Sequence, residues 1–123
     1  MTALAIVAFS GKSFTVAEEP ASKVLRHVVL FKFKESSSKE EVSKLIEEFR
    51  GLPKKISEIE SFEYGTDNSP EGLADGFTHC FLITFKSEKG RDAYLPHAAH
   101  QEFVSHVKPH LDKALVVDYW AAK

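Results

Sequence analysis

The chain has 123 residues, of which 43% are hydrophobic and 28% are charged, a composition typical of one globular domain with a single core. A formal net charge of −2, with no basic stripe interleaved with aromatic residues, argues against nucleic-acid binding. Cys80 is the single cysteine, which excludes an internal disulfide bond, and its apolar surroundings predict a buried thiol rather than a nucleophile.

Residues 1–24 differ in character from the remainder and are predicted to form a tail or signal-like segment ahead of a domain at 25–123. Residues 3–9 form a short apolar run, and small residues at 15–17 resemble the cleavage site of a secretory signal. No basic residue precedes the run, however, so an exported protein and a cytoplasmic one with a dispensable tail both remain open. The run is too short for a transmembrane helix, which needs about 20 apolar residues.

The first half of the domain predicts a strand, a helix and a second strand. Residues 26–34 alternate between two faces that both begin apolar, which is typical of a central strand. Ser38 and Glu41 have the spacing of a capping box, and apolar residues then recur at helical intervals until Gly51, expected at the C′ position. Residues 61–66 carry the second strand.

The second half begins with a loop at 67–76 that is rich in glycine, proline and asparagine. Residues 77–85 then alternate as a strand whose aromatic face is interrupted by His79. Residues 114–120 form the last strand, in which Asp118 is a carboxylate on an apolar face and therefore needs a cation or an imidazole as partner.

Between these strands the sequence predicts a helix that is broken by Pro96. Ser87 supplies the N-cap, and the helix is expected to end near Tyr94 because a proline disfavours the α conformation of the residue before it, here Leu95. A new helix, with Pro96 in its first turn, should run to about Val107.

The element order is thus β-α-β-β-α-β, which predicts an α+β, ferredoxin-like sandwich with both helices on one face of an antiparallel sheet. Apolar residues on the other face then need cover, which a homodimer closed sheet to sheet would provide. These residues are Val28, Leu30, Cys80 and Leu82.

Residues able to do acid/base chemistry gather around Pro96. His97 and His100, at i and i+3 of the second helix, should share one face, and Tyr94 could point at the same space. Imidazoles titrate near neutral pH, and a phenol can stabilise a developing oxyanion. The alternative is that these are surface or hydrogen-bonded structural histidines.

Metal binding is a further option, because the chain carries six histidines. No third ligand lies close to His97 and His100, and Pro109 interrupts any helix that would align His106 with His110. The spacing therefore predicts no metal site, and no cofactor is expected.

Four segments in order resemble the stress-responsive dimeric α/β-barrel (Dabb) family: RHVVLFKFK, GFTHCFLITF, DAYLPHAAHQEF and LVVDYW. The resemblance spans residues 26–120 and implies a homodimer whose two sheets form a barrel. Most members have no established reaction. One plant member is a metal-independent polyketide cyclase.

The resemblance to that cyclase implies His100 as catalytic base, Tyr94 as catalytic phenol and Asp118 as the support of His100. It also places two strand histidines, His27 and His79, near the pocket. One departure is visible, because proline here precedes the first histidine, in Pro96-His97-Ala98-Ala99-His100.

Two hypotheses follow. The first is a dimeric barrel protein whose pocket binds an apolar or phenolic small molecule. The second is a cyclase- or isomerase-like enzyme in which Tyr94 stabilises an enolate that His100 generates. The residues expected to line the pocket and contact the ligand are His27, His79, His97, Phe31 and Phe81.

Overall fold

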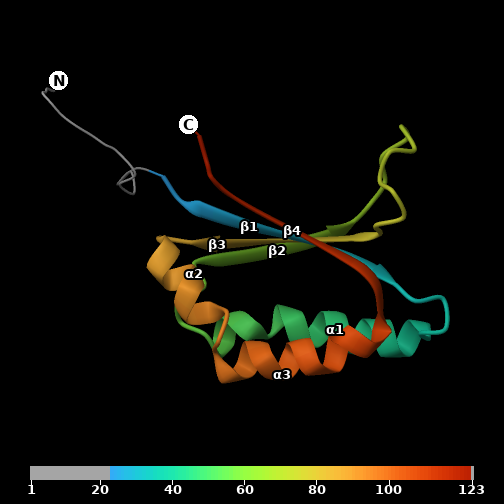
Figure 1. The fold of residues 1–123 in the computed structure, drawn as a ribbon, viewed down its shortest axis with the longest axis horizontal. Helices are drawn as coiled ribbons and strands as arrows, with labels where there is room; N and C mark the ends of the chain where they lie inside the picture. The colour runs from blue at the N-terminus through green and yellow to red at the C-terminus, as the bar shows by residue number, and fades with distance from the viewer. Residues whose placement is uncertain (1–22, 123) are drawn as a thin grey trace, which may run out of the picture.

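The computed structural model describes residues 23–122, so all but the last two residues of the signal-like segment lie outside the described residues. A single four-stranded sheet lies over the helices (Figure 1). The elements in chain order are β1 (Leu25–Phe33), α1 (Lys39–Arg50), η1 (Leu52–Lys54), β2 (Ser61–Thr66), β3 (His79–Phe85), α2 (Glu88–Tyr94), α3 (Ala98–Val107), η2 (Lys108–His110) and β4 (Leu111–Trp120).

The strand order is β2-β3-β1-β4 and each neighbouring pair is antiparallel, which confirms the ferredoxin-like fold. β1 is central, as its two apolar faces predicted. The long helices α1 and α3 lie on the same side of the sheet, and the opposite side carries no helix (Figure 1). Three strands differ from the predicted bounds, since β1 is shifted by one residue, β3 begins at His79 and β4 already begins at Leu111.

Local sequence signals set the start of α1. The Ser38 hydroxyl accepts a hydrogen bond from the Glu41 backbone N–H at 3.0 Å, and the Glu41 carboxylate accepts one from the Ser38 N–H at 2.8 Å. The capping box is therefore confirmed. Gly51 does end the helix, but as a C-cap with φ −81°, so the expected C′ position is wrong.

The break at Pro96 differs from the prediction. Leu95 keeps helical angles, φ −59° and ψ −45°, so the proline does not move it out of the α region. Pro96 also precedes the new helix instead of lying in its first turn. His97 is the N-cap of α3, and its Nδ1 accepts the Ala99 N–H at 3.1 Å. His97 therefore lies just before the helix that carries His100, although the two imidazoles remain close enough to interact electrostatically.

An aromatic cluster fills the space between the sheet and the helices. The ring centroids of Phe49 and Phe103 are 4.4 Å apart, and those of Phe49 and Phe81 are 4.6 Å apart. Phe31 stacks on the same group, 5.3 Å from Phe81. These rings join α1 and α3 to β1 and β3, and their burial stabilises the fold.

The sheet's outer face is apolar. It includes three exposed residues of β4, Leu115, Val117 and Tyr119, each between 45% and 48% exposed. Cys80 lies on this face too and is exposed, so the expectation of a buried thiol is wrong for the single chain. Successive side chains of a strand point to opposite faces, so the alternation that buries Phe81 turns Cys80 outward.

Candidate small-molecule site

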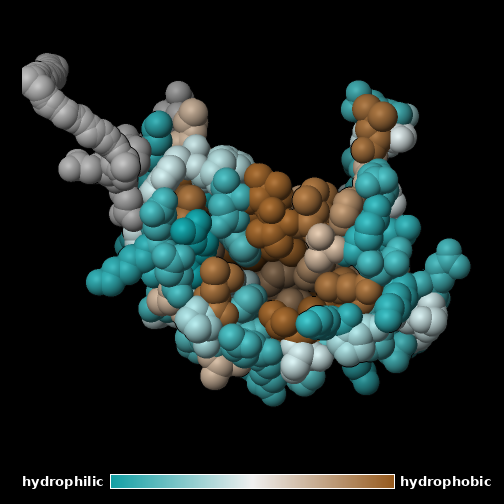
Figure 2. All heavy atoms as spheres, viewed as in Figure 1, coloured by the Kyte–Doolittle hydropathy of each residue, from teal (hydrophilic) through white to brown (hydrophobic). Residues whose placement is uncertain are grey.

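A cavity of about 560 Å³ opens between β4 and the helices α2 and α3. Figure 2 shows it as a hollow with hydrophobic atoms inside and polar atoms around its rim. The apolar lining comprises Val29, Phe31, Phe49, Leu95, Phe103, Val104, Val107, Leu111, Ala114 and Val116.

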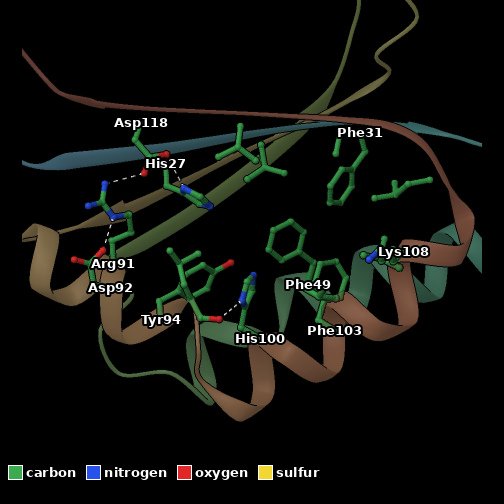
Figure 3. A pocket seen from close by; sticks show the side chains of 17 residues that line it. His27, Phe31, Phe49, Arg91, Asp92, Tyr94, His100, Phe103, Lys108 and Asp118 are labelled. Atoms are coloured by element: carbon green, nitrogen blue, oxygen red, sulfur yellow. Dashed lines mark hydrogen bonds and ion pairs between the residues drawn. The ribbon is translucent and has the colours of Figure 1, made fainter.

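Polar groups gather at one end of the cavity, where His27 of β1 meets Asp118 of β4 (Figure 3). The two residues are direct cross-strand partners, and the His27 Nδ1 lies 2.7 Å from the Asp118 Oδ1. Because an ionised carboxylate only accepts hydrogen bonds, Nδ1 is the protonated nitrogen. His27 is 5% exposed, so this bond fixes both its tautomer and its ring orientation.

Arg91 of α2 completes this group. Its NH1 donates to the second Asp118 oxygen, Oδ2, at 3.0 Å, and its Nε donates to Asp92 at 3.0 Å. The Asp118 carboxylate thus lies between a guanidinium and an imidazole, with both of its oxygens occupied. This arrangement supplies the cation and imidazole partners that the position of Asp118 required.

His100 faces the same end of the cavity from α3. Its Nδ1 donates to the backbone carbonyl of Leu95 at 2.9 Å, which leaves Nε2 as an acceptor. Burial lowers the pKa of His100 below its ordinary value, although the Leu95 carbonyl opposes the shift. The imidazole is accordingly neutral at pH 7 and has a free lone pair.

Tyr94 lies between the two histidines. Its ring centroid is 4.3 Å from that of His100 and 5.7 Å from that of His27. The residue is fully buried, and its hydroxyl is the one buried side-chain polar atom without a hydrogen-bond partner among the described residues. Burial raises the pKa of Tyr94 well above its ordinary value, so the phenol keeps its proton. Figure 3 shows the hydroxyl directed into the cavity.

The structure therefore brings together four of the predicted residues, His27, Tyr94, His100 and Asp118, and Phe31 lines the same cavity. The expected support of His100 by Asp118 is wrong, because Asp118 bonds His27 and the Leu95 carbonyl holds His100. Arg91 was missed by the sequence analysis. Arg91 precedes Tyr94 by three residues, so the two side chains share a face of the helix, and this spacing was the signal that could have placed Arg91 beside the cavity.

Three predicted pocket residues lie elsewhere. His79 is on the helix-facing side of β3 but lines a second cavity, where its ring makes an edge contact with Phe33 at 5.1 Å. His97 caps α3 and does not line the first cavity. Phe81 is fully buried in the aromatic core and has no surface available to a ligand.

Neither a metal-binding cluster nor a membrane-spanning helix is found among residues 23–122. No three histidine, cysteine, aspartate or glutamate side chains are close enough together there to hold a metal ion. In the same part of the chain, no helix has the length and apolar character to cross a membrane.

The pKa values of His79 and His100 predict acid-sensitive stability. Burial lowers both below the unfolded-state value of about 6.5, so between these values the unfolded chain binds more protons than the folded one. The contribution of the two neutral histidines to the free energy of unfolding is fully present above about pH 6.5. It is lost as the pH falls through the folded-state pKa values. Urea unfolding across this pH range should show the loss, and His79→Gln with His100→Gln should flatten it; an unchanged slope would contradict the assignment.

Comparison with known proteins agrees with this fold. The family described as "Stress responsive A/B Barrel Domain" matches residues 25–121. The stress-response A/B barrel domain-containing protein HS1 of Arabidopsis thaliana is 39% identical over 101 residues, which cover 82% of this chain and 93% of HS1. Olivetolic acid cyclase of Cannabis sativa is 24% identical over 99 residues, which cover 80% of this chain and 98% of the cyclase.

Solved structures extend the comparison. Hydroxynitrile lyase from Passiflora edulis superposes with a TM-score of 0.79 at 27% identity, covering 85% of this chain and 97% of the lyase. A protein from Thermobifida fusca, with a TM-score of 0.68 at 25% identity over 80% of this chain and 92% of its own, is described as dimeric and ferredoxin-like. From the family match and the identity to HS1, the chain belongs to the stress responsive A/B barrel domain family.

Proposed function

We propose that the cavity beneath β4 binds a small, largely apolar molecule that carries one hydroxyl or carbonyl oxygen. The observation that carries this proposal is the buried Tyr94 hydroxyl, which has no partner among the described residues and faces an apolar cavity. A buried hydroxyl without a hydrogen bond costs about 1–3 kcal/mol, and a ligand oxygen placed against it would recover that cost.

The size and lining of the cavity support this ligand class. A volume of about 560 Å³ suits a molecule of one or two rings. Aromatic rings of the core form its inner wall, with Phe31, Phe49 and Phe103 available for contact. Most donors and acceptors gather at the end with Tyr94, so the ligand oxygen would be directed there and the apolar part towards Phe103, while Lys108 lines the opposite end.

A second candidate function is proton transfer on the bound molecule, and the geometry of His100 favours it. The neutral imidazole has its Nδ1–H bound to a carbonyl and its Nε2 free, which is the state of a general base. In the proposed step, Nε2 takes a proton from an acidic C–H or O–H of the substrate. The Tyr94 O–H donates a hydrogen bond to the oxygen on which negative charge develops.

His27 would assist this step from the other side of Tyr94. The Asp118 carboxylate accepts its Nδ1–H, so the Nε2 of His27 is the nitrogen available to the ligand. Two relatives support an enzymatic reading, because one is named a cyclase and another a hydroxynitrile lyase. Both relatives are less than 30% identical to this chain, so the proposed reaction depends on the geometry of the site.

The test is hydrogen–deuterium exchange at an acidic C–H, which needs no knowledge of the natural substrate. A phenyl-substituted 1,3-diketone is incubated in D₂O with the full chain, and deuterium uptake at its central carbon is followed by NMR. Saturable exchange faster than the buffer rate is expected. His100→Gln should reduce kcat by about 10²-fold or more, and Tyr94→Phe should reduce it by about tenfold.

A matched control is His106→Gln. His106 is on the same helix, is half exposed and bonds Glu48 outside the cavity. An equal fall in kcat in the His100→Gln and His106→Gln variants would contradict the catalytic role of His100. Saturable binding of the diketone without accelerated exchange would leave ligand binding as the function and remove the proton-transfer candidate.

We also propose that the chain forms a homodimer through the outer face of its sheet. The exposed Leu115, Val117 and Tyr119 form an apolar row there, and relatives of the same fold are described as dimeric. Neither α1 nor α3 covers this side (Figure 1). A second copy would remove the apolar row from water.

Val117→Asp should abolish this dimer, because each of two facing copies would bury an unpaired carboxylate. Sedimentation velocity should then show a species of half the mass. Val116→Asp is the control, since Val116 is the adjacent residue of β4, is equally exposed and points to the cavity side. Retention of the dimer in both variants would place the interface elsewhere.

A further inference from the structure

A second cavity of about 460 Å³ lies at the opposite end of the sheet, where β1 leads into α1 and the loop from β2 enters β3. It shares no lining residue with the cavity beneath β4. Phe33 and His79 are on the helix side of the sheet, so the proposed sheet-to-sheet dimer would leave the cavity open.

The rim of this cavity carries an excess of ammonium groups. Lys32, Lys34 and Lys39 all line it, against one carboxylate, Glu35. Lys32 forms an ion pair with Asp112 at 3.2 Å. Within residues 23–122, Lys34 and Lys39 have no such anionic partner, so their charges are available to a ligand.

The wall is aromatic and apolar. The rings of Phe33 and His79 meet edge to face at 90°, and Ile46 of α1 closes the opposite side. The His79 Nδ1 lies 2.8 Å from the Thr78 hydroxyl, and this hydrogen bond fixes the orientation of the imidazole ring. The cavity thus combines a flat apolar surface with a cationic rim.

We propose that this second cavity binds a small aromatic anion, with its ring against Phe33 and His79 and its charged group towards Lys34 and Lys39. An aryl phosphate or an aryl carboxylate has both features. Neither a bare inorganic anion nor a neutral phenol would use the whole site. The rim is exposed to solvent, so binding should weaken as the salt concentration rises.

The test is an NMR titration of the ¹⁵N-labelled full chain with phenyl phosphate, followed at Thr78 and His79. Saturable shifts are expected at these residues, while His27 and His100 should respond far less. Inorganic phosphate and phenol, each carrying half of the proposed ligand, should bind there at least about tenfold more weakly, because each makes only part of the contacts. Benzoate should compete with phenyl phosphate.

The double variant Lys34→Met and Lys39→Met should weaken phenyl phosphate binding by at least about tenfold, since it removes both of the proposed cationic contacts. The double variant Lys54→Met and Lys55→Met is the control, because it removes the same charge from exposed positions near η1 and should bind normally. Equal weakening in both double variants would show a general charge effect and overturn the proposal. Non-saturating shifts at His79, or inorganic phosphate binding as tightly as phenyl phosphate, would also overturn it.

Discussion

Replacement of Asp118 by alanine is expected to lower the free energy of unfolding by about 3 kcal/mol, because it removes two charge-assisted hydrogen bonds at once. His27 is almost fully buried and would lose the acceptor of its Nδ1–H. Arg91, with a side chain only 20% exposed, would retain Asp92 alone. Urea denaturation of the purified variant measures the loss.

Two further variants make this prediction specific. Asp112→Ala is the control on the same strand. Asp112 forms an ion pair with Lys32, but the side chain of Lys32 is 39% exposed and that of Asp112 is 52% exposed, so the pair should contribute less than about 1 kcal/mol. Asp118→Asn keeps the shape and one acceptor oxygen, so it should recover part of the loss. A change no larger in Asp118→Ala than in Asp112→Ala would show that the Arg91–Asp118–His27 group does not stabilise the fold.

Replacement of Tyr94 by phenylalanine is expected to separate stability from function. The hydroxyl is buried and has no partner among the described residues, so its removal should leave the free energy of unfolding unchanged or raise it by about 1 kcal/mol. Ligand affinity should fall by about tenfold or more, since the hydroxyl is the proposed donor to the ligand oxygen. Thermal denaturation and NMR titration with a phenolic ligand test the two effects.

Tyr119→Phe is the matched control for this variant. Tyr119 is 46% exposed and lies on the outer face of the sheet. Removal of its hydroxyl should therefore neither raise the free energy of unfolding nor lower the ligand affinity. Marked destabilisation by Tyr94→Phe would mean that the hydroxyl has a structural partner. Unchanged affinity would remove Tyr94 from the ligand site.

The fold followed from signals that act over a few residues. The capping box of Ser38 and Glu41 is a contact across one helical turn, and strand alternation sorted Phe31 and Val29 onto the buried face. The backbone at Pro96 was less predictable. A proline only disfavours the α conformation before it, and the Leu95 N–H bonds the Arg91 carbonyl at 3.1 Å, which keeps that residue helical.

The candidate site depended on register and helix placement, which alternation does not supply. Alternation put His79 on the correct face, but it is paired with Phe31, whereas His27 is paired with Ile83. Four residues of strand separate the two positions, or about 13 Å. His79 therefore reaches a different cavity.

The partner of Asp118 illustrates the same point. Once β4 is placed beside β1, the register makes His27 and Asp118 direct neighbours, so His27 is the histidine that Asp118 can reach. His100 lies across the cavity on α3 and donates its Nδ1–H to the Leu95 carbonyl, in the turn before that helix. The contact from Arg91 required the orientation of α2 over the sheet, which no local pattern in the chain fixes.

The measurement that tests the site most directly is NMR of the histidine ring nitrogens in the full chain, recorded against pH with and without a phenolic ligand. We expect His100 to be neutral at pH 7, to carry its proton on Nδ1 and to show a pKa below the ordinary histidine value. Its Nε2 signal should shift on ligand addition, while exposed His106 stays unchanged. A His100 that is protonated at pH 7, or whose Nε2 carries the proton and ignores the ligand, would contradict the proposed site.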